Sequence, residues 1–187
     1  MESYQYNGEK AAVANKRTMR GSDVVLRFLA LALSLAAAVV LGVNKQSTTV
    51  AMSLVPTLPP VELPVTAKWH YLSANVFFVT ANAIACGHAA VSLILTLATR
   101  GASKGIAILV VLADLVMVAL LFSSIGAAGA IGLMGYQGNS HVQWKKVCNV
   151  FDRFCHQAAA ALGLSGAAAL VFFVLVVLST LNHYKKH

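Results

Sequence analysis

Four long apolar runs, separated by shorter polar segments, dominate the chain. The runs cover about residues 24–43, 71–97, 106–134 and 158–181. At about 1.5 Å per residue, a helix of this length crosses a hydrocarbon core about 30 Å thick. The pattern predicts an all-α integral membrane protein whose four transmembrane helices form a bundle spanning residues 24–181.

The polar segments predict how these helices connect. Residues 1–23 lack hydrophobic periodicity and predict a disordered tail, and residues 182–187 form a short basic tail. All four prolines lie in the loop 44–70, where they prevent a continuous helix and favour extended structure. The link at 98–105 is short enough to make the second and third helices an antiparallel hairpin. Residues 135–157 form the second loop.

The first run also has an alternative interpretation as a secretory signal, because a basic leader precedes it and small residues follow. A secretory apolar region usually has only about 7 to 15 residues. The run at 24–43 is longer. It is therefore interpreted as a membrane anchor.

The distribution of Lys and Arg predicts the orientation. The N-terminal tail has four, the link two and the C-terminal tail two, which makes eight, whereas the two loops together have five. Short segments richer in Lys and Arg stay in the cytosol. Both termini are therefore expected to be cytosolic, with loops 44–70 and 135–157 outside.

Composition supports lipid as the solvent of this chain. Hydrophobic residues make up 58% and charged residues only 11%, against about 25% charged residues in soluble domains. The net charge is +8, and the basic residues lie at the ends of the apolar runs. They do not form the continuous basic stripe that is typical of nucleic-acid binding. Membrane lipid is thus the expected partner, and nucleic acid is not.

Two charged residues, Arg27 and Asp114, lie inside apolar runs. Such a charge costs about 2.5 to 3.5 kcal/mol even on a lenient insertion scale. Counted along the helices, they lie roughly 5 and 12 Å from the cytosolic side. We predict an interhelical ion pair. The alternative is that Arg27 reaches lipid headgroups while Asp114 is protonated or faces a neighbouring subunit.

Polar and small residues predict close helix packing. Asn75 and Asn82 share a face of the second helix, and His88 adds a third polar side chain. Interhelical hydrogen bonds explain them, although a transport pathway would use the same polarity. Small-xxx-small spacing occurs as Gly126/Ala130 and Ala128/Gly132 in the third helix and as Gly163/Ala167 in the fourth. Whether these pairs pack within one bundle or between protomers stays open.

Two of the three cysteines, Cys148 and Cys155, lie in the second loop, on the expected oxidising side. In a continuous helix their Cα atoms would be about 10.5 Å apart, beyond the reach of a disulfide. A bridge therefore requires a turn, and we predict one. Free thiols, or a metal site with His141 and His156, are the alternatives.

Nothing in the sequence indicates catalysis. Residues 101–105, GASKG, match a nucleophile-elbow pattern, but they lie in the link between two helices. No cofactor or metal is expected.

Several segments together resemble the plant CASP-like proteins, relatives of the Casparian strip membrane domain proteins, and most closely their first subfamily. They are Arg27 after a basic tail, WHYLSANVFFVTANAIACGHAAVSL at 69–93, Asp114, and WKKVCNVFDRFCHQ at 144–157. The resemblance implies a MARVEL-like four-helix protein of the plasma membrane. It also implies that Arg27, Asp114 and the two loop cysteines correspond to the family's own.

The resemblance further implies self-association, with itself or with related CASP-like proteins, into a membrane platform that recruits cell-wall-modifying enzymes. The first-loop signature of the Casparian strip members is not found in residues 61–71, VELPVTAKWHY. The expected function is therefore a non-catalytic scaffold of the CASP-like type. The alternative is a small transporter or channel using the polar residues of the first three helices.

Overall fold

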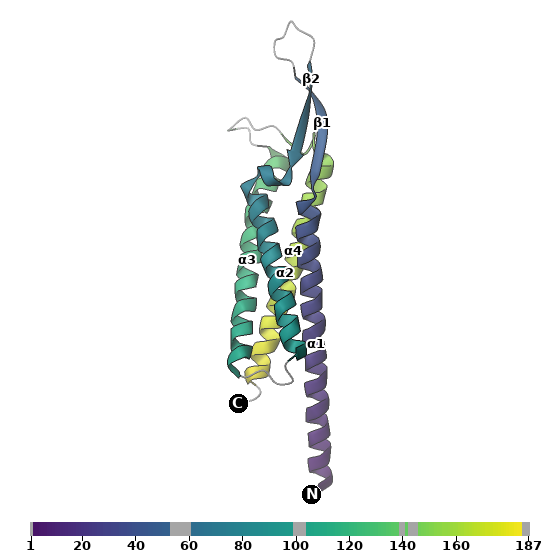
Figure 1. Cartoon of the computed structure of the whole chain (residues 1–187), viewed down its shortest axis with the longest axis vertical. Coiled ribbons are helices and arrows are strands. Elements are labelled where there is room, and N and C mark those ends of the chain that lie inside the picture. Colours follow the sequence, from purple (N-terminus) through teal and green to yellow (C-terminus); the bar gives the residue numbers. More distant parts are fainter. Residues whose placement is uncertain (1, 53–60, 99–103, 139–140, 142–145, 185–187) are drawn as a thin grey trace.

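The computed structural model describes residues 2–52, 61–98, 104–138, 141 and 146–184. Its four helices are α1 (Glu2–Gly42), α2 (Ser73–Ala98), α3 (Lys104–Gln137) and α4 (Asp152–Tyr184). They run side by side, up and down, so that both ends of the chain lie at the same end of the bundle (Figure 1). A β-hairpin stands at the other end.

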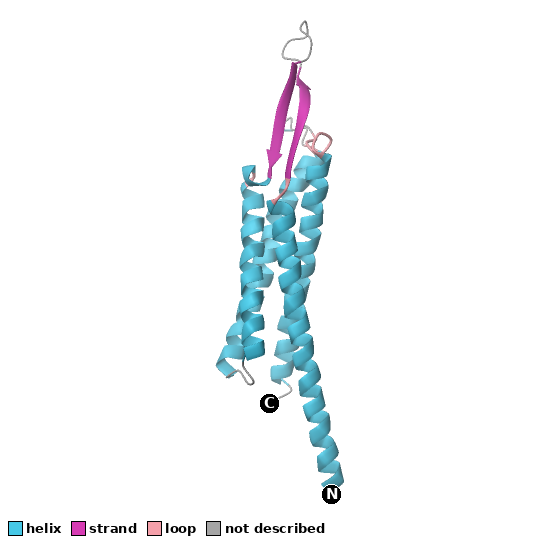
Figure 2. Cartoon of the chain, turned by 45° about the vertical axis from the view of Figure 1, so that its right-hand side comes forward, coloured by secondary structure: helices cyan, strands magenta, loops and turns pink. Residues whose placement is uncertain are grey.

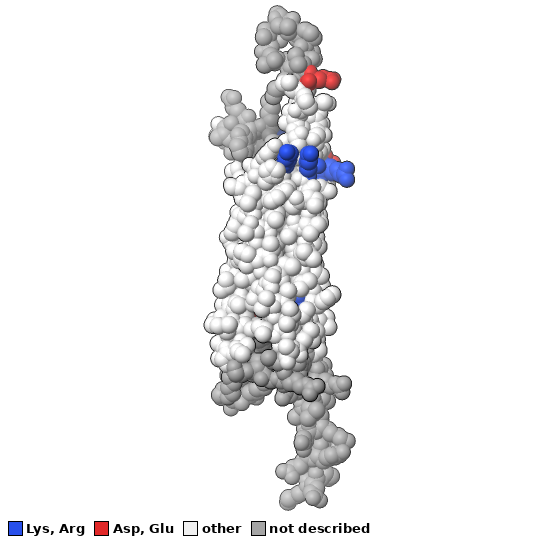
Figure 3. Space-filling view, in the orientation of Figure 1, with Lys and Arg blue, Asp and Glu red and all other residues white. Residues whose placement is uncertain are grey.

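Each helix contains a segment long and apolar enough to cross a membrane. These segments are Gly21–Gly42, Ser73–Ala98, Gly105–Gln137 and Asp152–Leu181. In space-filling view the bundle surface between the hairpin and the chain ends is almost free of charge (Figure 3). The prediction of a four-helix multi-pass membrane protein is confirmed.

The starts of α1 and α4 differ most from the predicted boundaries. A disordered tail was expected at 1–23, but α1 extends back to Glu2. Residues 9–20 are rich in good helix formers and continue an already nucleated helix, which favours propagation. The fourth helix begins at Asp152, inside the predicted second loop, because an acidic first turn suits a helix N-terminus.

Gly138, with φ 71°, ends α3 in the left-handed conformation.

The predicted first loop contains regular structure that sequence reasoning did not foresee. Strands β1 (Lys45–Met52) and β2 (Val61–Lys68) form an antiparallel hairpin (Figure 2), and the 3-10 turn η1 (Trp69–Tyr71) leads into α2. Pro64 is tolerated because a two-stranded sheet consists of edge strands. The extended conformation favoured by the prolines is thus paired rather than irregular.

The helices occupy the corners of a square in the order α1, α2, α3, α4. The main packing contacts join α1 to α2 and α4, and α3 to α4 and α2. Helices α1 and α3 are therefore diagonal neighbours, as are α2 and α4. Contacts across a diagonal must be made by side chains that point to the centre of the bundle.

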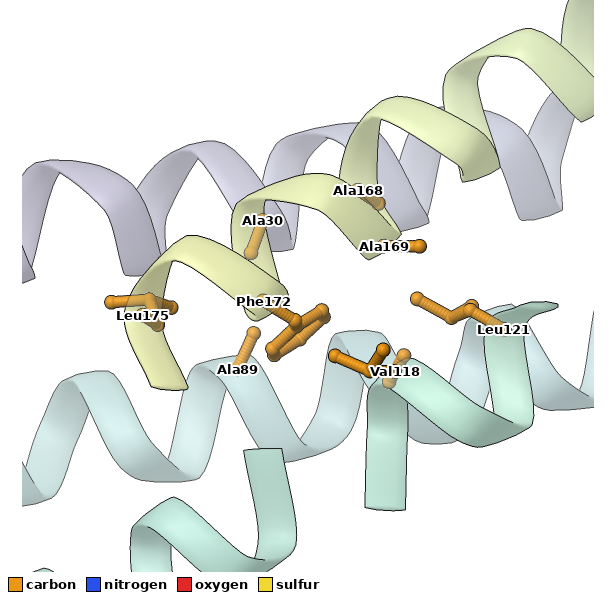
Figure 4. Close-up of a cluster of buried hydrophobic side chains, with 9 residues drawn as sticks. Ala30, Ala89, Val118, Leu121, Ala168, Ala169, Phe172 and Leu175 are labelled. Atoms are coloured by element: carbon orange, nitrogen blue, oxygen red, sulfur yellow. The ribbon is translucent and has the colours of Figure 1, made fainter. Parts of the chain in front are cut away.

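Two clusters of buried apolar side chains fill the bundle. The hairpin cluster, nearer the strands, consists of Ala37, Leu41, Phe78, Ala128 and Ala161. The terminal cluster, nearer the chain ends, is built around Phe172, which points toward Ala89 and Val118 (Figure 4). Its other members are Ala30, Ala85, Leu121, Ala168, Ala169 and Leu175. Alanines predominate, which allows the helix backbones to approach closely.

Candidate functional site

Arg27 and Asp114 meet across the diagonal between α1 and α3. Arg27 Nη2 lies 3.1 Å from Asp114 Oδ2, and Nη1 lies 3.4 Å from Oδ1. The two side chains are 4% and 0% exposed. Two parallel contacts of this kind give an arginine–carboxylate pair both strength and a defined orientation. The structure therefore brings together the two membrane charges singled out in the sequence.

The ion pair belongs to a larger polar network. His88 Nε2, from α2, lies 2.7 Å from Asp114 Oδ1. On the other side, Arg27 Nε donates to Asp23 Oδ2 at 3.1 Å. Thr96 Oγ1 lies 3.4 Å from the same oxygen, and its hydroxyl makes a shorter bond, 2.9 Å, to Ser92 O. We call Asp23, Arg27, His88 and Asp114 the charge network. It links α1, α2 and α3.

Sequence reasoning missed two members of this network. His88 was noted only as a polar residue of the second helix, and Asp23 was assigned to the N-terminal tail. Asp23 and Arg27 are four residues apart, which is the spacing of an ion pair on a helix surface. This spacing could have identified Asp23 as a partner of Arg27. His88 is a single histidine in a run of small residues, and no spacing in the sequence links it to Asp114.

The charge network is suited to holding helices rather than to chemistry. Each charged group is matched by an opposite charge or a hydrogen-bond donor, which offsets the cost of removing it from water. The ring of Phe172, from α4, lies next to the His88 ring, with the ring centroids 6.1 Å apart and an interplanar angle of 33°. All four helices thus contribute to this level of the bundle. Among the described residues, no group of three His, Cys, Asp or Glu side chains is placed to hold a metal ion.

The residues predicted to pack helices lie in two different environments. Asn75 and Asn82 are buried, 5% and 0% exposed. The Asn82 amide donates to Phe78 O of its own helix. The predicted small residues mostly lie on the outer surface of the chain. Ala128 is buried in the hairpin cluster and Ala167 is half-buried, but the others are exposed: Gly126, Ala130, Gly132 and Gly163.

A bridged loop closes the bundle below the hairpin. Cys148 and Cys155 form a disulfide with their Cα atoms 5.8 Å apart. The chain turns at 148–150, before α4 begins, which provides the turn that the bridge requires. Gly135 O accepts hydrogen bonds from the N–H groups of Val147 and Cys148. The loop is therefore fixed to the end of α3 as well as to the start of α4.

The hairpin is attached to the same place by two polar side chains that sequence reasoning did not identify. Asn44 Nδ2 donates to Phe154 O at 2.9 Å, and Phe154 N donates to Gln46 Oε1 at 2.8 Å. The first N–H groups of a helix have no partner within it, so Gln46 acts as a cap for α4. The disulfide and these two bonds together join the hairpin, α3 and α4.

We predict that alkylation of the native protein in the membrane will leave Cys148 and Cys155 unlabelled until a reductant is added. Replacing either by serine should cost about 2 to 3 kcal/mol of local stability, because the bridge restricts the unfolded loop. The four-helix bundle should survive, since its packing lies elsewhere. Non-reducing mass spectrometry measures the labelling. Both cysteines carrying the label before reduction would show that the bridge is absent from the protein.

Comparison with known proteins gives a consistent family. Residues 16–171 match the Casparian strip membrane protein domain. The chain is 59% identical over 169 residues to CASP-like protein 1E2 of Vitis vinifera, covering 90% of this chain and 87% of the relative. It is 55% identical over 164 residues to CASP-like protein 1E2 of Arabidopsis thaliana, covering 87% and 86%. The CASP-like protein 1E2 of Glycine max is 46% identical over 187 residues, the full length of both chains. No solved structure matches.

Proposed function

This chain belongs to the Casparian strip membrane protein family, and from that premise we propose that it is a non-catalytic scaffold of the plasma membrane. Copies of it self-associate, alone or with related CASP-like proteins, and organise a membrane platform. Both termini face the cytosol, and the hairpin and the bridged loop face the cell wall. On that side the platform recruits cell-wall-modifying enzymes.

The observation that carries this proposal is the outward face of α3. Of the four spans, α3 is the least covered by the rest of the chain, with 17% of its most apolar window buried, against 28% to 33% in the others. Gly126 and Ala130 lie on this face and are exposed, and a Cβ added at Gly126 would meet nothing within 4 Å. Small side chains let the backbone of another helix approach closely in lipid. The face fits a second copy of the chain.

The test is a paired replacement on this face, Gly126→Leu with Ala130→Leu. The larger side chains should block close helix approach and reduce self-association at least severalfold, while the fold of each monomer is retained. The matched control is Gly87→Leu on α2, another exposed glycine with nothing within 4 Å of its Cβ position. Photobleaching of fluorescent fusions in plant cells, with crosslinking in membranes, measures confinement and oligomer size. Unchanged confinement in the α3 variant would remove this face from the proposal.

A small transporter or channel is the second candidate, because polar side chains lie inside the bundle. In the charge network these side chains are paired with one another, and the apolar hairpin cluster lies between the network and the β-hairpin. Ion and solute flux into liposomes containing the purified protein separates the two functions. A scaffold gives no flux above that of empty liposomes.

A further inference from the structure

A second polar feature lies at the middle of the bundle, apart from the charge network. One polar side chain from each helix is completely buried there, at 0% exposure. Each stands three or four residues from a member of the terminal cluster on one side and of the hairpin cluster on the other. The four residues are Ser34, Asn82, Ser124 and Ser165. We call them the central layer.

The register of the four helices places these residues at one level. Asn82 lies between Phe78 and Ala85 along α2, and Ser165 lies between Ala161 and Ala168 along α4. Phe78 and Ala161 belong to the hairpin cluster, and Ala85 and Ala168 belong to the terminal cluster. Because α2 and α4 are diagonal neighbours, Asn82 and Ser165 approach the centre from opposite corners.

The hydrogen bonds of the central layer are incomplete in a specific way. Ser34 Oγ donates to Ala30 O at 2.8 Å, and Ser124 Oγ donates to Leu121 O at 2.9 Å, so both hydroxyl hydrogens are used within their own helices. In contrast, Asn82 Oδ1 and Ser165 Oγ are buried atoms without a partner. An unpaired buried polar atom costs about 1 to 3 kcal/mol. The layer therefore holds one acceptor and one hydroxyl, on diagonally opposite helices, that have no hydrogen-bond partner.

We propose that the central layer binds one water molecule between Asn82 and Ser165. Water can donate to Asn82 Oδ1 and accept from the Ser165 hydroxyl at the same time. The oxygens of Ser34 and Ser124, whose hydrogens point to their own helices, can still accept its second hydrogen. Buried waters typically make about three such bonds to otherwise unpaired groups. The site thus offers as many partners as a buried water needs.

The two apolar clusters make this a closed site rather than part of a pathway. On either side the water meets buried alanine, leucine and phenylalanine side chains, which offer it no further partner. Its role is to specify the fold: in helical bundles a single buried polar position can fix register and partner choice. The four polar residues lie at one level only when the helices are aligned as in this structure. Sliding any one helix along its axis would place its polar residue against an apolar cluster.

A double-mutant cycle tests the shared water through Asn82→Leu and Ser165→Ala, with unfolding measured in lipid bicelles. Each single replacement leaves the water without one partner. It should shift the folding equilibrium about tenfold toward the unfolded state. The double replacement should shift it by much less than the product of the two, because groups that share a partner are coupled. The matched control is Ser92→Ala, a buried serine of α2 whose hydroxyl bonds Ala89 O. Its effect should combine additively with that of Asn82→Leu.

Solid-state NMR of the unmodified protein in bilayers supplies a readout that does not depend on any variant folding. Magnetisation should pass from water to the side chains of Asn82 and Ser165 but not to the alanines on either side. Energetic coupling in the mutant cycle together with magnetisation transfer from water supports the site. Energetic coupling without magnetisation transfer would mean that the two side chains bond each other directly. Additive energies in the mutant cycle would mean that they act separately. Either result overturns the proposal.

Discussion

Asp114→Leu is expected to destabilise the bundle by about 3 to 5 kcal/mol, since it leaves Arg27 buried in the membrane without its main partner. His88 loses its acceptor in the same step. A loss of this size approaches the whole stability of a typical domain. The variant should therefore accumulate poorly and fail to leave the compartment where it is made. Unfolding by denaturant in bicelles, together with the amount of protein reaching the cell surface, measures the effect.

Two further variants distinguish pairing from a general sensitivity to substitution. The double replacement Arg27→Leu with Asp114→Leu removes both charges and should be milder than Asp114→Leu alone, because no unpaired arginine remains. Asp152→Leu changes a carboxylate that is 79% exposed and should cost at most about 1 kcal/mol, through its place in the first turn of α4. Equal stability of Asp114→Leu and the unmodified protein would contradict the role given to the ion pair.

The second large effect is expected from Phe172→Ala. Phe172 is completely buried in the terminal cluster, and its ring lies next to the His88 ring. Truncation of a buried phenylalanine usually costs about 3 to 5 kcal/mol, through lost contacts and the cavity that remains. Helix packing in lipid depends on such contacts, because lipid tails are as apolar as the side chain itself.

The neighbouring residue provides the control for Phe172. Phe173 lies on the same turn of α4 but is 51% exposed on the outer surface. Phe173→Ala should therefore change the unfolding free energy little. The Phe173 side chain faces lipid tails, which are as apolar as the side chain, whether or not the helices are packed together. Thermal unfolding of the two variants side by side gives the comparison. Similar losses of stability in both variants would mean that the terminal cluster is not a packed core.

The sequence was sufficient for the membrane helices and for one long-range contact. Apolar length identified the spans, because lipid demands it of every crossing helix. Arg27 and Asp114 could be paired in advance, since charges are rare in such spans and their depths were similar. The loop cysteines could be predicted to form a bridge because the loop was expected to face an oxidising compartment, and the structure pairs them.

Other features depend on tertiary contacts that leave little trace in the sequence. The strands of the hairpin contain threonine, proline and lysine in an order that also suits an irregular loop. They pair with each other through a backbone ladder, and the bonds of Asn44 and Gln46 to Phe154 attach the hairpin to α4. The central layer is equally hidden. Isolated serines are common in membrane helices, and only the packed bundle brings one from each helix to the same level.

The position of Asp23 has a consequence for how the protein is made. Arg27 precedes Asp114 by 87 residues, so the ribosome delivers the first span to the membrane well before the partner of its arginine exists. Asp23, one helical turn away, already lies 3.1 Å from Arg27 Nε. A helix that carries both residues brings a pair of opposite charges to the insertion machinery instead of a lone cation, which lowers the cost of entry. We therefore expect Asp23 to be the ion-pair partner of Arg27 until α3 has been inserted.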